Sequence, residues 1–215
     1  MKKSNPRFLI AKICIILSMF LLGRWMYDKL PLQVPMHRNA QWSIDGYGSR
    51  LTTVLLLPCI SVFFLILFFF IPKIDPKRAR YQEFWSAREW IQILLLLYFA
   101  YFYTIIFYII LHPEVSILPL MSWGIGVLFF VLWIAMKHVK SNYFVGIKTP
   151  WTLANEEVWD KTHSVWAWTF AGAGVVCVID AFVWIAVFPV FFSAIMVGAL
   201  LPVVYSYIIY KKIVK

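Results

Sequence analysis

The chain has 215 residues, of which 62% are hydrophobic, 19% aromatic and only 14% charged. Soluble domains average about 25% charged residues, and a core of this size cannot bury so many apolar side chains. The composition therefore excludes a soluble globular protein and indicates a polytopic membrane protein. The net charge of +10 raises the question of a nucleic-acid partner, but we expect none, because no basic face carries base-stacking aromatic residues.

Six stretches are long and apolar enough to be membrane spans, since a helix needs roughly 20 mostly apolar residues to cross about 30 Å of hydrocarbon. They are residues 8–27, 51–71, 91–111, 117–136, 164–187 and 190–210. The sequence thus predicts an all-α fold, a bundle of six transmembrane helices. The first stretch lacks a small-residue cleavage site, so we interpret it as a retained span rather than a signal peptide.

The basic residues predict the orientation of these spans. If the amino terminus is cytoplasmic, 16 of the 20 Lys and Arg residues lie at inside ends, including Lys2, Lys3 and Lys215. The four at the outside are Arg24, Lys29, Arg38 and Arg50. The positive-inside rule then places both termini in the cytoplasm, and the inner basic residues are expected to attract lipid headgroups.

Two regions follow from this arrangement. Residues 1–90 contain two spans, an outer loop at 28–50 and a basic inner loop at 72–90. Residues 91–215 contain four spans and a second inner loop at 137–163. Cys14, Cys59 and Cys177 lie singly in apolar runs, so neither a disulfide framework nor a zinc site is expected.

The outer loop is expected to be ordered but not helical, because it contains Pro31 and Pro35 and a turn signal at Asp45-Gly46. Its polar residues form a candidate recognition surface for a molecule outside the cell: His37, Asn39, Asp45 and Tyr47. The alternative is that these side chains only satisfy the loop's own backbone.

The first inner loop places Tyr81, Phe84 and Trp85 at helical spacing beside basic residues. This pattern is typical of a helix lying among lipid headgroups. Docking of a cytoplasmic protein is the alternative.

The second inner loop contains the start of a helix. Asn155 is a suitable N-cap, and Glu156 and Glu157 suit the first turn, so a helix should begin near Glu156 and lead into the fifth span. Glu156, Asp160 and His163 then share one face, which could be a metal or acid/base site or a solvated face. Because capping already explains the glutamates and no HExxH pairing is present, we expect no metal and no cofactor. Four tryptophans are expected to form an interfacial belt: Trp151, Trp159, Trp166 and Trp168.

Asp180 is the one acidic residue inside a predicted span. An ionisable residue in lipid is a functional candidate by default. The alternatives are a structural ion pair, with Arg24 as the expected partner, or a protonated, hydrogen-bonded carboxyl. The nearby Ala171-Gly172-Ala173-Gly174 run indicates close helix contact.

The second inner loop resembles the signature of the SdpI family of bacterial membrane immunity proteins. The resemblance rests on residues 146–153, 157–159 and 162–163, and the chain around residues 30–50 and 74–77 is similar to a domain of unknown function that often precedes the signature. The chain departs from the family at Lys148 and Ser164, where arginine is usual. In the outer loop, Arg38 and Trp42 replace the more common tryptophan and glycine.

The resemblance implies a non-enzymatic protein that protects the cell from a secreted, membrane-active peptide toxin of the SdpC type. The candidate binding residues in the signature loop are Lys148, Thr149, Pro150, Trp151, Asn155, Glu156, Glu157, Trp159 and His163. Whether this loop binds a partner or only determines the fold stays open. The alternatives are a membrane sensor that recruits a cytoplasmic repressor, and a small proton-coupled transporter or membrane enzyme that uses Asp180 or the carboxylate–histidine face.

Overall fold

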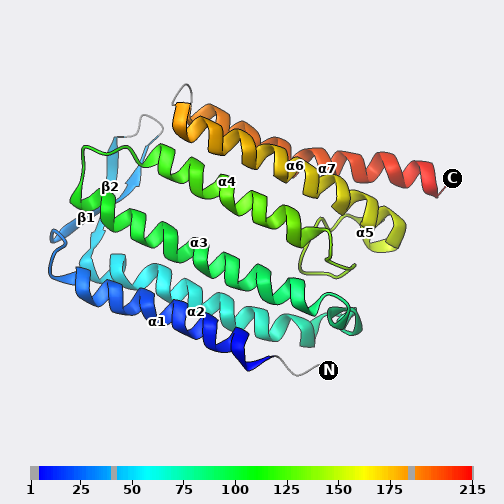
Figure 1. Cartoon of the computed structure of the whole chain (residues 1–215), viewed down its shortest axis with the longest axis horizontal. Helices are drawn as coiled ribbons and strands as arrows, with labels where there is room; N and C mark the ends of the chain where they lie inside the picture. The colour runs from blue at the N-terminus through cyan, green and yellow to red at the C-terminus, as the bar shows by residue number, and fades with distance from the viewer. Residues whose placement is uncertain (1–4, 40–42, 184–186, 215) are drawn as a thin grey trace. The chain divides into compact units, whose positions relative to one another are not determined.

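The computed structural model describes residues 5–39, 43–183 and 187–214. Lys2, Lys3 and Lys215 of the orientation argument, and Trp42 of the outer loop, lie outside the described residues. Within the described part, six helices are long and apolar enough to cross a membrane, which confirms the helical fold predicted from the sequence (Figure 1). They are α1 (Pro6–Tyr27), α2 (Arg50–Ile74), α3 (Trp85–Leu111), α4 (Ile117–Met136), α6 (Glu156–Val183) and α7 (Val187–Ile213).

The helix starts follow from local capping. Asn5 Oδ1 accepts a hydrogen bond from the Arg7 backbone N–H at 3.0 Å, directly before Pro6, and proline at a first helical position needs no donor. Asn155 Oδ1 accepts from the Val158 N–H at 3.1 Å, as its position predicts. The helix that starts at Glu156 and the predicted fifth span are therefore one continuous helix, α6.

The chain divides into two compact units. One contains residues 4–67 and 95–117, and the other contains residues 1–3, 68–94 and 118–215. The boundary between these units passes through α2 and α3. The predicted regions 1–90 and 91–215 instead divide the chain by sequence order, so the units do not test them.

In the first unit the outer loop is a β-hairpin, which the helical prediction did not include. Strand β1 (Gln33–Arg38) pairs antiparallel with β2 (Ile44–Ser49). The predicted turn at Asp45-Gly46 was wrong, because both residues lie within β2. The chain reverses between the strands, where the Asn39 N–H donates to Ser43 O and the Ser43 N–H to Asn39 Oδ1, both at 3.0 Å.

The hairpin is attached to the helices through Val34, which is fully buried. Val34 belongs to an apolar cluster that includes Met19 and Met26 of α1, Val54 of α2 and Tyr103 of α3. The Tyr103 hydroxyl donates to the Val54 carbonyl at 2.7 Å, so the buried phenol is satisfied. One face of the hairpin is thus held by the core of this unit.

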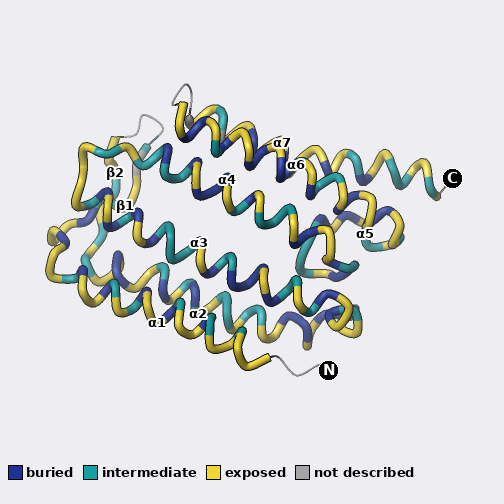
Figure 2. The backbone as a smooth tube through the Cα atoms, viewed as in Figure 1, coloured by how far each residue is buried: buried dark blue, intermediate teal, exposed yellow. Residues whose placement is uncertain are grey.

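In the second unit α4 and α6 cross at two glycines. A Cβ atom on Gly126 would lie 2.8 Å from the Gly174 carbonyl oxygen, and a Cβ on Gly174 would lie 2.8 Å from that of Gly126. The close helix contact predicted from the small-residue run is therefore formed by Gly174, whereas Gly172 faces open space. Figure 2 shows much of α7 exposed, as expected of a helix that faces lipid.

Candidate functional site

The two inner loops of the second unit form one folded assembly around Asp75, which is only 2% exposed. Asp75 Oδ2 accepts hydrogen bonds from the Tyr81 hydroxyl at 2.7 Å and the Tyr143 N–H at 3.0 Å, and Oδ1 accepts from the Lys77 N–H at 2.7 Å. Burial, and secondly the bond to Asp75, raise the pKa of Tyr81. The carboxylate thus joins segment 72–90 to segment 137–163.

Lys77 adds a second connection between the same segments. Its Nζ donates to Ser141 Oγ at 2.6 Å and to the Leu153 carbonyl at 3.0 Å. Arg80 also forms an ion pair with Glu156 at the start of α6. The first inner loop is therefore a partner of the second, and we call these two segments together the inner platform.

This packing contradicts the predicted interfacial helix. Residues Arg78–Gln82 form a short 3-10 helix, η1, and Tyr81 and Phe84 are each only 3% exposed, with ring centroids 5.1 Å apart. The prediction was wrong because aromatic residues at helical spacing pack as readily against protein as against lipid.

Asn142 shapes the loop that precedes the signature. Its Oδ1 accepts from the Phe144 and Val145 N–H groups at 2.8 and 2.6 Å, and its Nδ2 donates to the Lys140 and Val145 carbonyls at 2.8 and 2.9 Å. Every hydrogen-bonding atom of this buried amide is used, so the side chain stabilises the turn.

His163 closes the signature loop from α6. Its Nε2 accepts from the Ile147 N–H at 3.1 Å, and its Nδ1 lies 2.9 Å from the Trp159 carbonyl oxygen. A carbonyl can only accept, so Nδ1 carries the proton and Nε2 does not. The buried ring is therefore neutral, and it stacks on Trp159 with centroids 3.9 Å apart.

Gly146 lies against this pair with φ +122°. A Cβ here would collide with His163 Nε2 and would lie 2.9 Å from the Trp159 ring. Both the backbone conformation and the close approach require glycine.

The Thr149–Thr152 segment begins the short helix α5 (Pro150–Ala154). Thr149 and Thr152 form a reciprocal capping box, and Thr152 Oγ1 also donates to the Ile147 carbonyl at 2.8 Å. Trp151 Nε1 donates to Ser206 Oγ, and its ring lies 5.2 Å from that of Tyr207. The signature loop is thereby attached to α7.

The carboxylate–histidine face predicted on α6 is not assembled. Glu156 pairs with Arg80, Asp160 Oδ2 lies 3.9 Å from Lys140 Nζ, and His163 is buried against Ile147. Across the described residues, no group of three His, Cys, Asp or Glu side chains could hold a metal ion. The helical spacing of these three residues predicted a shared face, but each side chain contacts a different part of the inner platform.

The signature residues divide by exposure. Five of them are buried or half-buried and hydrogen-bonded, Trp151 to Ser206 of α7 and the others within the inner platform, namely Thr149, Trp151, Asn155, Trp159 and His163. Four are exposed, namely Lys148, Pro150, Glu156 and Glu157. Of the four tryptophans in the predicted belt, Trp168 is exposed, whereas Trp159 is completely buried and donates to the Val139 carbonyl at 2.9 Å.

The outer hairpin exposes most of its predicted recognition residues. His37 Nδ1 lies 2.6 Å from Asp45 Oδ1, with the two side chains 72% and 41% exposed, and Tyr47 is exposed beside them. Asn39 instead serves the turn's backbone, which was the alternative interpretation. Exposed apolar side chains on the same segment are Leu32, Met36 and Ile44.

Arg24 has another partner than Asp180, which the sequence suggested. Its Nη1 lies 3.1 Å from Oδ2 of Asp28, the residue that caps the C-terminal end of α1, and both side chains are exposed. Asp180 is buried in α6, and its Oδ2 has no hydrogen-bond partner among the described residues.

Sequence reasoning missed four residues that hold the inner platform together: Asp75, Lys77, Asn142 and Ser206. The Asp75-Pro76-Lys77 turn and the Ser141-Asn142 pair carry recognisable turn chemistry. Ser206 lies in an apolar helix and gives no sequence signal of its contact.

Comparison with known proteins shows which families two parts of this chain match. Residues 138–206 match the model of the SdpI/YfhL protein family, and residues 14–62 match a domain of unknown function (DUF1648). The second match covers the outer hairpin but not residues 74–77, which had been included in that resemblance.

The chain is also 23% identical to Immunity protein SdpI of Bacillus subtilis (strain 168) over 208 residues, which cover 95% of this chain and 96% of that protein. No solved structure matches the chain. The resemblance predicted from the second inner loop is therefore confirmed: residues 138–206 match the model of the SdpI/YfhL protein family, in a chain with six helices that are long and apolar enough to cross a membrane.

Proposed function

We propose that this protein is a non-enzymatic immunity protein that protects the cell from a secreted, membrane-active peptide toxin. The observation that carries the proposal is the similarity to Immunity protein SdpI along 95% of the chain. Within the inner platform, His163 and Asp75 are buried and bonded to the loops around them, which is a structural role for both residues.

The orientation belongs to the same proposal. Both termini and the inner platform face the cytoplasm, and the hairpin faces outward. This is supported by the 16 of 20 basic residues on the inner side. A test is thiol labelling of intact cells in a background without native cysteines: Ser43→Cys in the hairpin should react with an impermeant reagent, and Ala154→Cys should react only after permeabilisation. The reverse pattern would invert the orientation.

The hairpin is the proposed point of contact with the toxin. Tyr47, Leu32 and Met36 give it exposed apolar area beside the His37–Asp45 pair, and tyrosine supplies much contact area with little loss of side-chain entropy. Val34 meanwhile fixes the hairpin to the helices, so this surface is presented on a stable support.

The test is growth protection. The wild-type protein is expressed in a sensitive strain and challenged with an SdpC-type peptide, beside Tyr47→Ala and a control, Glu114→Ala, which alters an exposed carboxylate in the α3–α4 connection. We expect protection by the wild type and the control and a loss with Tyr47→Ala at equal membrane abundance. Absence of protection by the wild type would reject the immunity proposal, and full protection by Tyr47→Ala would reject the hairpin as the contact.

A further inference from the structure

Lys137, the residue that follows α4, lies against two tryptophan rings. Its Nζ is 4.6 Å from the ring centroid of Trp133, one turn earlier in α4, and 4.4 Å from the ring centroid of Trp168 in α6. The centroids of the two rings are 5.4 Å apart, and all three residues belong to the second unit. Both rings attract the ammonium group, so its position is defined by two helices.

The second ring distinguishes Lys137 from lysines at other helix ends. Lys73 lies over Phe69 and Phe70 of its own helix, α2. Lys211 likewise lies over Tyr207 within α7. A lysine on its own helix surface is typical of a side chain that reaches the membrane surface, whereas Lys137 has a fixed place where two helices meet.

The charge of Lys137 is not neutralised by a carboxylate. The acidic side chains at the start of α6 pair with other basic residues: Glu156 with Arg80, Glu157 with Lys161 and Asp160 with Lys140. Among the residues that the structure describes, no carboxylate forms an ion pair with Lys137. The site is therefore complementary to an anionic group.

The surface next to this site, further into the spans, is apolar and open. Phe130 of α4 is 43% exposed, and its ring centroid is 5.2 Å from that of Trp133. A Cβ atom on Gly174 would lie 3.3 Å from the Phe130 backbone N, so this part of α6 has the same depth as Phe130. A Cβ on Gly172 would have nothing within 4 Å, which leaves space for an acyl chain.

The spacing of these residues fits a phospholipid. Gly172 follows Trp168 by four residues, so both lie on one face of α6. From Phe130 to Lys137 the chain rises about 10 Å at 1.5 Å per residue, which is less than the roughly 15 Å of hydrocarbon in one leaflet. A phosphate at Lys137 therefore leaves the acyl chain at the level of Phe130.

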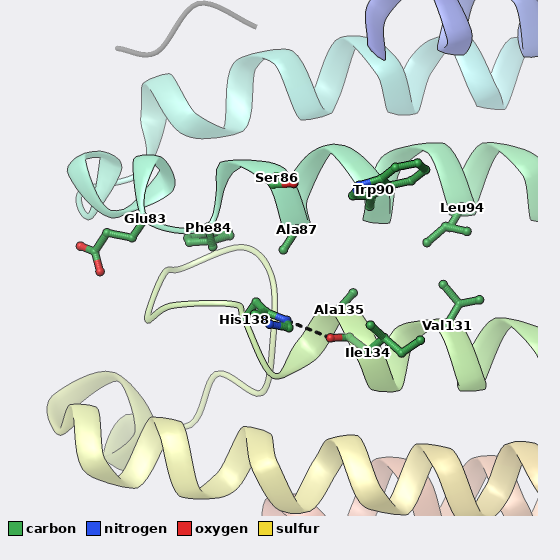
Figure 3. Close-up of a pocket in the computed structure, with 10 residues that line it drawn as sticks. All are labelled: Glu83, Phe84, Ser86, Ala87, Trp90, Leu94, Val131, Ile134, Ala135 and His138. Carbon is green, nitrogen blue, oxygen red and sulfur yellow. Dashed lines mark hydrogen bonds between the residues drawn. The ribbon is translucent and has the colours of Figure 1, made fainter. Parts of the chain in front are cut away.

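The cavity between α3 and α4 is a separate feature. Figure 3 shows it on another side of α4, where Val131, Ile134 and His138 are among the residues that line about 470 Å³. Neither Lys137 nor Trp133 lines it. The Nδ1 atom of His138 lies 3.0 Å from the Ile134 carbonyl oxygen, so His138 is not part of the lysine site although it is the next residue.

We propose that Lys137, Trp133 and Trp168 bind an anionic phospholipid of the phosphatidylglycerol class. Lys137 donates to the phosphate, and an acyl chain lies against Phe130 and Gly172. A zwitterionic headgroup also carries a cation, which the ammonium group of Lys137 repels from the rings that would attract it. The site therefore prefers a headgroup without a cation, and it is independent of toxin recognition at the hairpin.

The test is native mass spectrometry of the full-length protein in detergent, with equal amounts of dioleoyl phosphatidylglycerol and dioleoyl phosphatidylethanolamine. We expect the wild type to retain more phosphatidylglycerol. Lys137→Gln should reduce this preference about fivefold, which corresponds to the roughly 1 kcal/mol that one lysine contributes near anionic lipid. Glutamine keeps a polar side chain and removes the charge.

Two further variants complete the experiment. Lys161→Gln removes the same charge from an exposed lysine that pairs with Glu157 and should keep the preference. Gly172→Leu fills the open space and should reduce retention of phosphatidylglycerol while the protein stays monodisperse. Equal binding of the two lipids by the wild type, an unchanged preference in Lys137→Gln, equal reductions in Lys137→Gln and Lys161→Gln, or unchanged retention in Gly172→Leu would each overturn the proposal.

Discussion

The inner platform and the outer hairpin are both built from polar segments between apolar helices, yet they use their polar residues in opposite ways. In the platform, Asp75, Asn142 and His163 are buried and hydrogen-bonded to backbone and side-chain groups from distant parts of the chain. In the hairpin, His37 and Asp45 bond mainly to each other and face outward.

This difference predicts which segment tolerates change. Removing one partner from a buried hydrogen bond leaves the other unsatisfied and costs about 1–3 kcal/mol, whereas an exposed ion pair contributes about 0–1 kcal/mol. Substitutions in the platform should therefore destabilise the protein, and those on the hairpin's exposed face should alter recognition alone. The following substitutions test this contrast.

The largest effect is expected at Asp75. Asp75→Ala leaves the Tyr81 hydroxyl and the Lys77 and Tyr143 N–H groups without their acceptor. Because three donors, one of them fully buried, lose their acceptor, we expect a loss of about 3 kcal/mol in the free energy of unfolding. Thermal unfolding in detergent measures it.

The matched control is Asp28→Ala, which removes an exposed carboxylate paired with Arg24. We expect its melting temperature to stay close to that of the wild type. Equal effects of the two substitutions would contradict the buried network as the stabilising feature.

Gly146→Ala is expected to have the next largest effect. The residue has φ +122°, and the new methyl group would collide with His163 and the Trp159 ring. Backbone strain of this kind costs about 1–3 kcal/mol. Gly172→Ala, in a helix with nothing within 4 Å of the new atom, should stabilise by up to about 1 kcal/mol, and the same unfolding measurement compares the two. If both substitutions changed the free energy of unfolding in the same direction and by a similar amount, glycine would not be required at position 146 for steric reasons.

The helices were predictable from the sequence because hydrocarbon imposes a strict length and composition on a span. The start of α6 was predictable as well, since the Asn155 cap is a local interaction. The hairpin was not predicted: its strands are short, and Gly46 and Gly48 interrupt the alternation that marks a strand.

Within the inner platform, the sequence predicted site residues only in the segment that resembles the family signature. Its exposed and buried residues could not be separated, because the burial of Trp159 and His163 depends on Val139 and Ile147, which lie up to twenty residues away. Tyr81 was mistaken for a lipid anchor for the same reason, since its partner Asp75 is defined only by the fold.

Tyr81→Phe should have a moderate effect that depends on pH. At neutral pH it removes one buried hydrogen bond, worth about 1 kcal/mol. Burial and Asp75 raise the pKa of Tyr81 in the folded protein, so the phenol stays neutral there while it ionises in the unfolded chain above about pH 10. The free energy of unfolding of the wild type should then fall by about 1.4 kcal/mol per pH unit from this residue.

The other tyrosines are present in both proteins, so the difference between wild type and Tyr81→Phe isolates the contribution of Tyr81. Melting temperatures from pH 8 to above pH 10 should converge as the pH rises. A constant difference across this range would mean that Tyr81 is as accessible to ionisation in the folded protein as in the unfolded chain.

The smallest effect on stability is expected at Asp45, where the comparison between the two regions is sharpest. Asp45→Ala should change the free energy of unfolding by less than about 1 kcal/mol, because its pair with His37 is exposed. Val34→Ala, in the opposite strand, should cost about 2 kcal/mol, because it removes buried methyl groups from the core. Thermal unfolding and growth protection are measured together for both variants. Loss of protection by Asp45→Ala at unchanged stability would make its exposed carboxylate part of recognition, since folding could not account for the loss. Unchanged protection would restrict the contact surface to the apolar residues around Tyr47.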